Sequence, residues 1–379
     1  MNQIRVIIFF TKDMSLVGWD NAGIINREIL LYKRLILKGI QVSFITYGNS
    51  DDLKYFDRLP GIKVLCNKWG LPKYIYNKYL HIIHRKHLKS CNIIKTNQMF
   101  GADIALKAAK YYNKPLLNRM GYLLSDAVKQ LKDFSSFDTG DVNKMEKSVF
   151  NYADKIVVTT SQMSERINNS HLGIKQKVKI IPNFVDQNIF SPAFSKEKLF
   201  DILFIGRLSE QKNINSLIEA VDKSSLKILI IGNGPLKQPL INKFGNLEGR
   251  VEWIDNIPNE EIPKYMNQSK IFVLPSFYEG HPKVLIEAMS CGMTVIASNV
   301  QGNSEIINDG ENGFLCDTSI VSIQETIIKV LKMSIKKLNM ININARQFIK
   351  DNYSLDKIVT MEMQLYEDIM NENNSKNLA

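Results

Sequence analysis

The sequence has little of what marks membrane-spanning, secreted or metal-binding proteins. It contains no run of about 18 uncharged apolar residues, so we expect no transmembrane helix. The apolar run in MNQIRVIIFFTKD is too short for a signal peptide and has no small-residue cleavage site, which predicts a buried first strand and a cytoplasmic protein. The four cysteines, Cys66, Cys91, Cys291 and Cys316, lie far apart without a CxxC pair, so free buried thiols are expected rather than a zinc site or disulfides.

Histidines and cofactor fingerprints are also scarce. His81, His84 and His87 stand at a helical spacing that suits a metal, but no carboxylate accompanies them, and no DxD sequence follows an expected strand. We therefore expect no metal and no other cofactor. The GNGP sequence at residues 232–235 is too short for the GxGxxG dinucleotide fingerprint, which disfavours a nicotinamide-dependent dehydrogenase.

The net charge of +11 is distributed unevenly. Residues 1–195 contain 29 basic and 15 acidic residues, whereas residues 196–379 contain 20 and 23. No carboxylate occurs between Asp57 and Asp103, where nine Lys or Arg residues do, and in residues 68–90 these cations alternate with aromatic residues. Such a segment suits an anionic membrane surface or a phosphate backbone, and a solvated face is the alternative. Because no RRM, helix-turn-helix or zinc-finger pattern occurs, we favour peripheral membrane contact and expect no nucleic acid partner.

The remaining pattern is that of an α/β protein. An apolar share of 45% and a charged share of 23% are ordinary for a globular chain, and 379 residues exceed what one core usually organises. Short β-branched runs alternate with amphipathic stretches, which predicts βαβ units and parallel sheets. The expected strands are residues 4–10, 41–46, 62–65, 92–95, 115–118, 155–159, 178–181, 201–205, 227–231, 251–254, 271–274 and 294–297. The expected helices include residues 24–38, 102–112, 214–223, 282–290, 321–333 and 354–370, followed by a polar tail, NENNSKNLA.

A linker is expected at residues 181–200, which contain two of the chain's eleven prolines and little periodicity. Ligands of doubly wound sheets bind outside the carboxyl ends of the strands. Two such domains that face each other would form a cleft between those edges, so the functional residues should follow strands.

The strongest local pattern is PSFYEGHPKVLIEAMSCG, residues 275–292. It follows an expected strand, places Pro282 where the first turn of a helix tolerates proline, and places Gly292 where helices commonly end. The pattern therefore predicts an exposed helix N-terminus after a strand. Such a terminus favours anions, and a diphosphate is the expected ligand.

Two carboxylates flank this helix start. Glu279 stands just before it, near the amides of Gly280, His281 and Lys283, and Glu287 lies within the helix. Carboxylates accept hydrogen bonds from sugar hydroxyls, so this pair could hold two ends of a nucleotide sugar. The alternative is a solvated Glu279 and a structural ion pair at Glu287.

Three other loops are candidates. In FIGRLSEQKNI, Arg207 and Lys212 follow a buried strand and could neutralise a diphosphate leaving group without a metal, unless they are plain surface cations. GNGP is equally compatible with a tight turn that binds nothing. In GWDNAG, Gly18 and Gly23 would let a loop approach a phosphate or sugar, unless this is an ordinary turn.

Together these motifs resemble a known family. GRLSEQKN, GNGPL, PSFYEGHPKVLIEAMSCG and GNSEIINDGENGFL are similar, in this order, to the donor domain of family-four retaining glycosyltransferases, also called glycosyl transferases group 1. The segments at residues 153–167 and 179–190 resemble that family's strand, serine-started helix and interdomain crossing. The resemblance implies the GT-B fold, which has two facing Rossmann-like domains and a deep interdomain cleft. It places an acceptor-side domain at residues 1–184, with residues 355–379 packing back onto it, and a donor domain at residues 185–354.

The resemblance also implies roles. Arg207 and Lys212 would hold the donor diphosphate and stabilise it as it leaves, Glu279 would contact the transferred sugar, and Glu287 would contact the ribose. Four more residues would line the donor site: Gly280, His281, Pro282 and Lys283. Transfer would retain the anomeric configuration without a metal, through a short-lived oxocarbenium-like ion pair, and the departing phosphate would help to deprotonate the acceptor.

Some positions depart from the family pattern. Arg119 stands where many relatives have a histidine, Asn97 and Gln98 occupy a polar acceptor-side cluster, and Phe184 replaces a frequent glycine. Gly23, Asn97 and Arg119 are therefore the acceptor-side candidates.

The resemblance implies a transferase that builds a cell-surface polysaccharide, lipopolysaccharide, glycolipid or lipid-linked oligosaccharide at the inner membrane face. A UDP-sugar is the first donor class to test, and GDP-mannose is the second. The alternatives are a nucleotide-sugar 2-epimerase, for which the chain lacks a histidine set, and a non-catalytic sugar-binding relative.

Overall fold

The computed structural model describes residues 3–130, 138–170, 173–193, 198–247 and 249–378. The chain forms two compact units: unit 1 comprises Met1–Pro182 with Ile358–Ala379, and unit 2 comprises Asn183–Lys357. The boundaries expected from the sequence were 184/185 and 354/355. Residues 194–197 of the expected linker lie outside the described residues.

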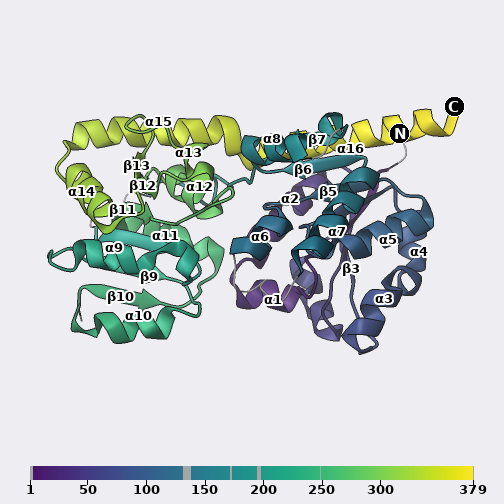
Figure 1. Cartoon of the computed structure of the whole chain (residues 1–379), viewed down its shortest axis with the longest axis horizontal. Helices are drawn as coiled ribbons and strands as arrows, with labels where there is room; N and C mark the ends of the chain where they lie inside the picture. Colours follow the sequence, from purple (N-terminus) through teal and green to yellow (C-terminus); the bar gives the residue numbers. More distant parts are fainter. Residues whose placement is uncertain (1–2, 131–137, 171–172, 194–197, 248, 379) are drawn as a thin grey trace. The chain divides into compact units, whose positions relative to one another are not determined.

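Unit 1 contains a parallel sheet of seven strands in the order β3-β2-β1-β4-β5-β6-β7. The strands β3, β5, β6 and β7 are labelled in Figure 1. The strands are β1 Arg5–Phe9, β2 Gln41–Ile45, β3 Ile62–Leu65, β4 Ile93–Thr96, β5 Leu116–Arg119, β6 Lys155–Val158 and β7 Val178–Ile180. In β4 and β6 every residue is buried, as is typical of parallel strands with helices on both faces. The register of the central strand is fixed by pairing of Val6 with Val42 on one side and Ile93 on the other.

Helices connect these strands. They are α1 Leu16–Asn21, α2 Ile25–Leu37, the 3-10 helix η1 Ser50–Arg58, α3 Lys73–Ile83, α4 Arg85–Ser90, α5 Ala102–Tyr112, α6 Leu124–Gln130, α7 Thr139–Tyr152, α8 Ser161–Ser170 and the 3-10 helix η3 Lys175–Lys177. Near the end of β1 the rings of Phe10 and Trp19 stack with their centroids 4.0 Å apart, and Phe44 of β2 packs beside them. This aromatic cluster fixes α1 against the sheet.

The last helix, α16 Leu355–Leu378, is tied to unit 1 by a buried ion pair. The Lys95 ammonium on β4 lies 2.6 Å from the Glu362 carboxylate, and the two side chains are 0% and 1% exposed. The Tyr366 hydroxyl lies 3.2 Å from the same ammonium, and Lys155 pairs with Glu372 at 2.5 Å. The tail that the sequence suggested at residues 371–379 is part of this helix as far as Leu378.

Unit 2 contains a parallel sheet of six strands in the order β10-β9-β8-β11-β12-β13 (Figure 1). The strands are β8 Phe200–Ile205, β9 Ile228–Ile231, β10 Val251–Ile254, β11 Ser269–Leu274, β12 Thr294–Ser298 and β13 Phe314–Cys316. The helices are the 3-10 turns η4 Glu210–Lys212, η5 Gly245–Leu247 and η6 Asn259–Glu261, with α9 Ile214–Val221, α10 Lys237–Phe244, α11 Ile262–Gln268, α12 Lys283–Ser290, α13 Gln301–Ser304, α14 Ile320–Leu331 and α15 Ile335–Tyr353. The helix α14 packs against α9, and α15 packs against α12.

The strand order confirms the expected α/β class with two Rossmann-like domains. In each unit the chain winds outward from a first central strand and then reverses, between β1 and β4 in unit 1 and between β8 and β11 in unit 2. Loops that follow the two central strands leave a crevice at this point, where doubly wound sheets bind ligands. The candidate residues should therefore lie after β8 and β11, and after β1 and β4.

Two expectations from composition are also resolved. None of the described helices is both long and apolar enough to cross a lipid bilayer. All four cysteines are free and buried, as expected, and burial raises the pKa of the Cys66 thiol to about 11 and that of Cys291 to about 12. These thiols are protonated near neutral pH and contribute to packing.

Candidate active site

The loops after β8 and β11 are joined by hydrogen bonds. The Gln211 side chain donates to the Tyr278 carbonyl at 2.9 Å, and the Phe277 amide donates to the Gln211 carbonyl at 2.9 Å. Asn213, which adopts a left-handed φ of 51° before α9, donates through its side-chain amide to the carbonyls of Pro275, at 3.1 Å, and Thr318, at 2.9 Å. The two loops of the crevice therefore form one rigid assembly within unit 2.

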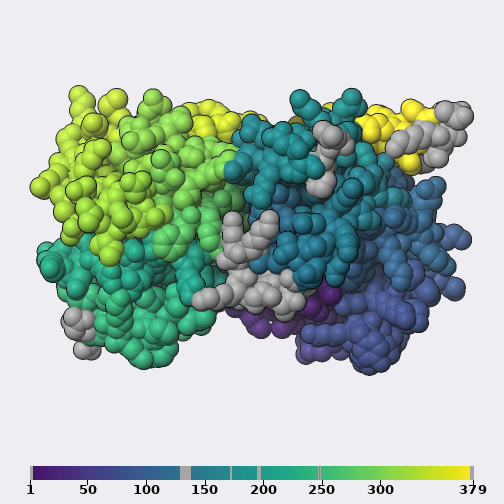
Figure 2. Space-filling view, in the orientation of Figure 1, coloured from purple at the N-terminus to yellow at the C-terminus, as the bar shows by residue number. Residues whose placement is uncertain are grey.

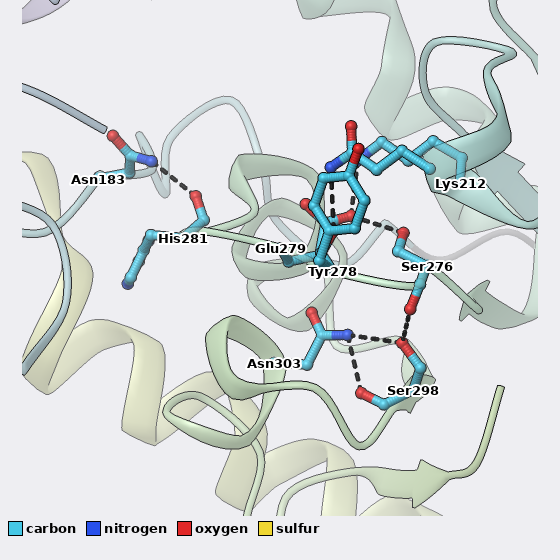
Figure 3. A network of polar contacts seen from close by, with 9 residues as sticks. Asn183, Lys212, Ser276, Tyr278, Glu279, His281, Ser298 and Asn303 are labelled. Carbon is cyan, nitrogen blue, oxygen red and sulfur yellow. Dashed lines mark hydrogen bonds and ion pairs between the residues drawn. The ribbon is translucent and has the colours of Figure 1, made fainter. Parts of the chain in front are cut away.

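This assembly brings two of the expected residues into direct contact. The Lys212 ammonium lies 2.6 Å from Oε1 of Glu279, and the side chains are 16% and 7% exposed (Figure 3). The Ser276 hydroxyl donates to the same carboxylate oxygen at 2.6 Å. Arg207 lies on the same loop as Lys212 and is exposed. A cation and a carboxylate so close at the carboxyl ends of two central strands can bind the anionic and the hydroxylic parts of one ligand.

The expected helix after β11 is confirmed as α12. Pro282 is its N-cap residue, and Gly292, with a φ of 70°, follows its last turn. The first amides of a helix have no partner within the helix, so the start of α12 presents N–H groups and a partial positive charge beside Glu279. Gly280, His281 and Lys283 lie at this start, as the sequence predicted.

The side chain of His281 belongs to the packing of unit 2. Its ring contacts the edge of the Tyr353 ring, with the centroids 4.8 Å apart, and it is buried. In Figure 3 the ring points away from the Lys212–Glu279 pair, while the His281 carbonyl accepts a hydrogen bond of 2.7 Å from the Asn183 side chain. The ring of His281 is therefore packed against Tyr353, and its backbone lies at the start of α12.

Glu287 lies inside α12 and is only 1% exposed. Its Oε1 accepts a hydrogen bond of 3.1 Å from the side chain of Asn259, which is also buried and lies in η6 after β10. The structure therefore places Glu287 behind the helix start and fixes it through a residue that sequence reasoning missed. No motif around Asn259 distinguishes it from an ordinary loop asparagine.

The GNGP turn supports the Arg207 loop by close backbone contact. A Cβ atom on Gly232 would lie 2.0 Å from the Gly206 carbonyl oxygen, and one on Gly234 would lie 2.4 Å from that of Leu208. The Leu208 amide also donates to the Asn233 carbonyl at 2.9 Å. Both glycines are thus required by packing, which explains the motif without a ligand.

A buried polar network lies behind Glu279 (Figure 3). The Ser298 hydroxyl at the end of β12 donates to the carbonyl of Ser276, and the Asn303 side-chain amide donates to the Ser298 hydroxyl at 3.2 Å and to the Ser298 carbonyl at 2.9 Å. Gly302 lies so close to this loop that a Cβ atom there would be 1.9 Å from the Gly280 carbonyl oxygen. Gly302 and Asn303 belong to the GNSE motif, whose part in the site was not evident from the sequence.

In unit 1 two acceptor-side candidates are neighbours. Asn97 follows β4 and donates its amide to the Phe9 carbonyl at 2.8 Å, while Arg119 at the end of β5 donates from its guanidinium to the Asn97 carbonyl at 3.3 Å. Gly23, with a φ of 69°, lies in the turn between α1 and α2. Asn97 and Arg119 thus lie at the crevice of unit 1, and Gly23 has at least a conformational role.

The N-terminus of α1 already holds an internal carboxylate. Oδ1 of the buried Asp52 accepts hydrogen bonds from the amides of Leu16, at 2.9 Å, and Val17, at 3.2 Å, and its Oδ2 accepts from the Thr46 hydroxyl at 2.5 Å. Burial raises the pKa of Asp52, and the three hydrogen bonds oppose this change. Gly18 therefore lies within α1 and not in the loop expected from the sequence, and two amides at the start of this helix are used within the fold.

The histidine trio does not converge on a common point. His84 is buried with Nε2 2.9 Å from the Tyr76 hydroxyl, and burial lowers its pKa to about 4. The His81 ring packs against Tyr111. Among the residues that the structure describes, no group of three or more His, Cys, Asp or Glu residues is arranged to hold a metal ion.

Comparisons with known proteins indicate the family and the fold. Residues 185–348 match the family model described as glycosyl transferases group 1. The chain is 31% identical over 219 residues to the UDP-Gal:alpha-D-GlcNAc-diphosphoundecaprenol alpha-1,3-galactosyltransferase of Escherichia coli, a match that covers 51% of the chain and 55% of that enzyme. The chain thus spans about half the length of this relative.

Solved structures share the fold over nearly the whole chain. A sucrose-phosphate synthase from Thermosynechococcus elongatus superposes with a TM-score of 0.82 at 19% identity, over 97% of this chain and 100% of that one. HepE from Anabaena, solved in complex with UDP-glucose, superposes with a TM-score of 0.75 at 17% identity, over 96% and 99%. At such identities the likeness establishes the fold.

Proposed function

The chain belongs to the group 1 glycosyl transferases of GT-B fold, and from this premise we propose that it transfers a sugar from a nucleotide diphosphate sugar to a saccharide or lipid-linked acceptor. The observation that supports this best is the contact of Lys212 with Glu279 beside the start of α12. One crevice of unit 2 thus offers a cation and helix amides for a diphosphate, and a carboxylate for sugar hydroxyls. A UDP-sugar is the proposed donor class, since the Escherichia coli relative is named for UDP-Gal and HepE was solved with UDP-glucose.

The proposed mechanism is retaining and needs no metal. Arg207, Lys212 and the amides at Gly280 and Lys283 would stabilise the negative charge that develops on the departing diphosphate. Glu279 would hold the sugar. Glu287, which accepts a hydrogen bond from Asn259, would hold the ribose. The leaving phosphate stays on the face from which it departed, so it can accept the acceptor's proton there, and the new bond forms on that same face.

The proposed acceptor is bound by unit 1. Asn97 and Arg119 supply an amide and a guanidinium at the crevice of that unit, and Gly23 borders the preceding loop. A guanidinium forms paired hydrogen bonds with phosphate, which suits an acceptor sugar carried on a lipid diphosphate. The Escherichia coli relative is named for such an acceptor.

Such an acceptor requires access to a membrane, and we propose that the outer face of residues 68–90, which include α3 and α4, provides it at the cytoplasmic side. Trp69 and Tyr74 are 54% and 73% exposed, and exposed lysines alternate with them. The ammonium of Lys68 lies 5.0 Å from the centroid of the Trp69 ring, so charge and aromatic surface are presented together. Figure 2 shows this segment, in dark blue, on the outside of unit 1. Anionic headgroups attract the lysines, and aromatic rings favour the interface.

Nucleotide binding followed by transfer tests the function. Thermal shifts with UDP, GDP, ADP and CMP and their sugars should show stabilisation by one nucleotide and its sugar. With that donor and a lipid diphosphate-linked sugar, Lys212→Ala should lower kcat by about 100-fold to 1,000-fold, because one charge at the leaving group is lost. Activity in EDTA and an NMR assignment of the product anomer test metal independence and retention.

The matched control is Lys270→Ala, which removes an exposed lysine paired with Asp201 elsewhere in unit 2. Its activity should stay within about twofold of the wild type, since exposed ion pairs contribute little. Full turnover by Lys212→Ala would refute the proposed role of this lysine. Conversion of the donor to its epimer without any acceptor would favour the epimerase alternative, and binding without transfer or hydrolysis would favour a sugar-binding relative.

A further inference from the structure

We propose that Ser276, supported by Ser298 and Asn303, is a positioning residue that keeps the Glu279 carboxylate in place when the donor diphosphate engages Lys212. This inference rests on the proposed function and concerns the step at which the donor binds.

The starting point is that one oxygen of Glu279 has two partners. Oε1 accepts hydrogen bonds of 2.6 Å from the Lys212 ammonium and of 2.6 Å from the Ser276 hydroxyl. The ammonium is also the group proposed to bind the diphosphate. A diphosphate carries more negative charge than one carboxylate, so its arrival draws the lysine towards the phosphate oxygens. Ser276 is then the partner that continues to hold Oε1.

Ser276 can hold Oε1 because its own backbone is fixed by a hydrogen bond from Ser298. Its side chain is completely buried, and its carbonyl accepts the hydroxyl proton of Ser298. With that proton committed, the Ser298 oxygen can only accept from Asn303, whose side-chain amide lies 3.2 Å away and is likewise fully buried. Every hydroxyl proton in the network thus has one assigned acceptor.

The loop after β11, which carries Ser276 and Glu279, is supported by a different element, the helix α13. Asn303 lies on α13, after β12, and its neighbour Gly302 touches the loop after β11: a Cβ atom on Gly302 would be 2.6 Å from the Glu279 carbonyl oxygen. The peptide of Glu279 is therefore held by α13, and its carboxylate is held by Ser276. Two independent restraints on one catalytic side chain are what preorganisation requires.

Loss of this restraint should affect binding of the sugar and not binding of the diphosphate. Loss of the Ser276 hydroxyl leaves the groups proposed to bind the diphosphate unchanged, namely Arg207, Lys212 and the start of α12. It frees the carboxylate that is proposed to bind the sugar. The affinity for a nucleoside diphosphate should therefore be kept, while the additional affinity contributed by the sugar should fall.

The experiment measures dissociation constants by calorimetry for UDP and UDP-galactose, with GDP and GDP-mannose as a second pair. For Ser276→Ala we expect the UDP value to stay within about twofold of the wild type. The affinity ratio of UDP-galactose to UDP should fall about tenfold, as for one lost hydrogen bond to a charged group. The kcat should fall with it, and Ser276→Thr, which keeps a hydroxyl, should restore both.

The matched control is Ser304→Ala on α13, where the hydroxyl makes an exposed hydrogen bond of 3.1 Å to the Gln301 carbonyl and is outside the network. It should leave both affinities unchanged. If Ser276→Ala weakens UDP and UDP-galactose by the same factor, or weakens neither, the positioning role is overturned while the proposed function stands. If the wild type binds no nucleoside diphosphate at all, the proposed function and this inference fail together.

Discussion

At the scale of single residues, glycines shape the candidate site as much as charged side chains do. Gly232 and Gly234 let the GNGP turn touch the Arg207 loop, and Gly302 lets α13 touch the loop that carries Glu279. In each case a backbone carbonyl occupies the space where a Cβ atom would be. A carbonyl in a packed loop cannot move as a flexible side chain can, so these positions accept no larger residue without a shift of the loop.

Gly302→Ala tests this constraint. The added methyl group would lie 1.9 Å from the Gly280 carbonyl oxygen, so the loop must move. We expect a loss of about 1–3 kcal/mol in the free energy of unfolding, and a larger effect on kcat than on the affinity for the free nucleotide. Urea denaturation and steady-state kinetics measure the two effects.

The control is Gly245→Ala in the same unit, where a Cβ atom would meet nothing within 4 Å. This variant should be as stable and as active as the wild type. Equal stability and kcat in Gly302→Ala and Gly245→Ala would show that α13 does not restrain the site.

The sequence predicted the residues of this site that follow a strand, but not those that support them. Lys212 and Glu279 could be found because loops after parallel strands converge at one edge of a sheet. Ser298 contacts Ser276, and Asn259 contacts Glu287, only because the fold brings them together. The partners are 22 and 28 residues apart along the chain. Short polar residues in loops have many alternative uses, so no local pattern distinguishes these two.

At the scale of elements, the attachment of α16 to β4 depends on a buried charge pair. Burial lowers the pKa of Lys95, and the adjacent Glu362 carboxylate opposes this change, so the ammonium depends on its partner. Glu362→Gln should lower the free energy of unfolding by about 3–5 kcal/mol, because it leaves a buried cation without a counter-charge. Denaturant unfolding followed by fluorescence measures the loss.

Two further variants check this explanation. The double change Lys95→Met with Glu362→Leu removes both charges and should recover most of the stability. Glu372→Gln breaks the Lys155 pair, in which the glutamate side chain is 48% exposed, and should cost less than about 1 kcal/mol. A double variant no more stable than Glu362→Gln would contradict the role given to the charge pair.

Helices and strands could be predicted where apolar residues recur along the chain with the period of a helix or form the short run of a strand. All twelve expected strands are present with ends that differ by at most two residues. Most of them are short runs rich in buried β-branched or aliphatic residues, whereas β7 and β10 contain no buried residue. The strand β13, Phe314–Cys316, was missed, since three residues carry too little periodicity. The end of α16 was taken for a tail because its composition is polar. It is a helix whose outward face is solvated and in which Glu372 is paired.

At the scale of the whole molecule, charge asymmetry is the basis of the membrane proposal. Flotation with phosphatidylglycerol vesicles should carry the protein upward, and vesicles of phosphatidylcholine alone should not. Replacing Lys73, Lys78, Lys86 and Lys89 with Gln should lower the partition coefficient on the order of 100-fold to 1,000-fold, at about 1 kcal/mol per lysine.

A matched set in unit 2 controls for net charge. Lys329, Lys332, Lys336 and Lys337 are equally exposed on or between α14 and α15, and their replacement with Gln should leave flotation unchanged. Equal loss in the two sets would show a general charge effect and contradict a dedicated surface. If the protein binds single-stranded oligonucleotides and does not bind vesicles, the partner of this surface is a nucleic acid and the membrane proposal is wrong.

The discontinuity of unit 1 has a consequence for how the protein is made. Lys95 leaves the ribosome long before Glu362, which lies 267 residues later in the chain. During translation the Glu362 carboxylate, which pairs with Lys95 inside the first sheet, therefore becomes available only after the whole of unit 2 has been synthesised. The unit whose synthesis begins first thus receives its last helix after the other unit has been made.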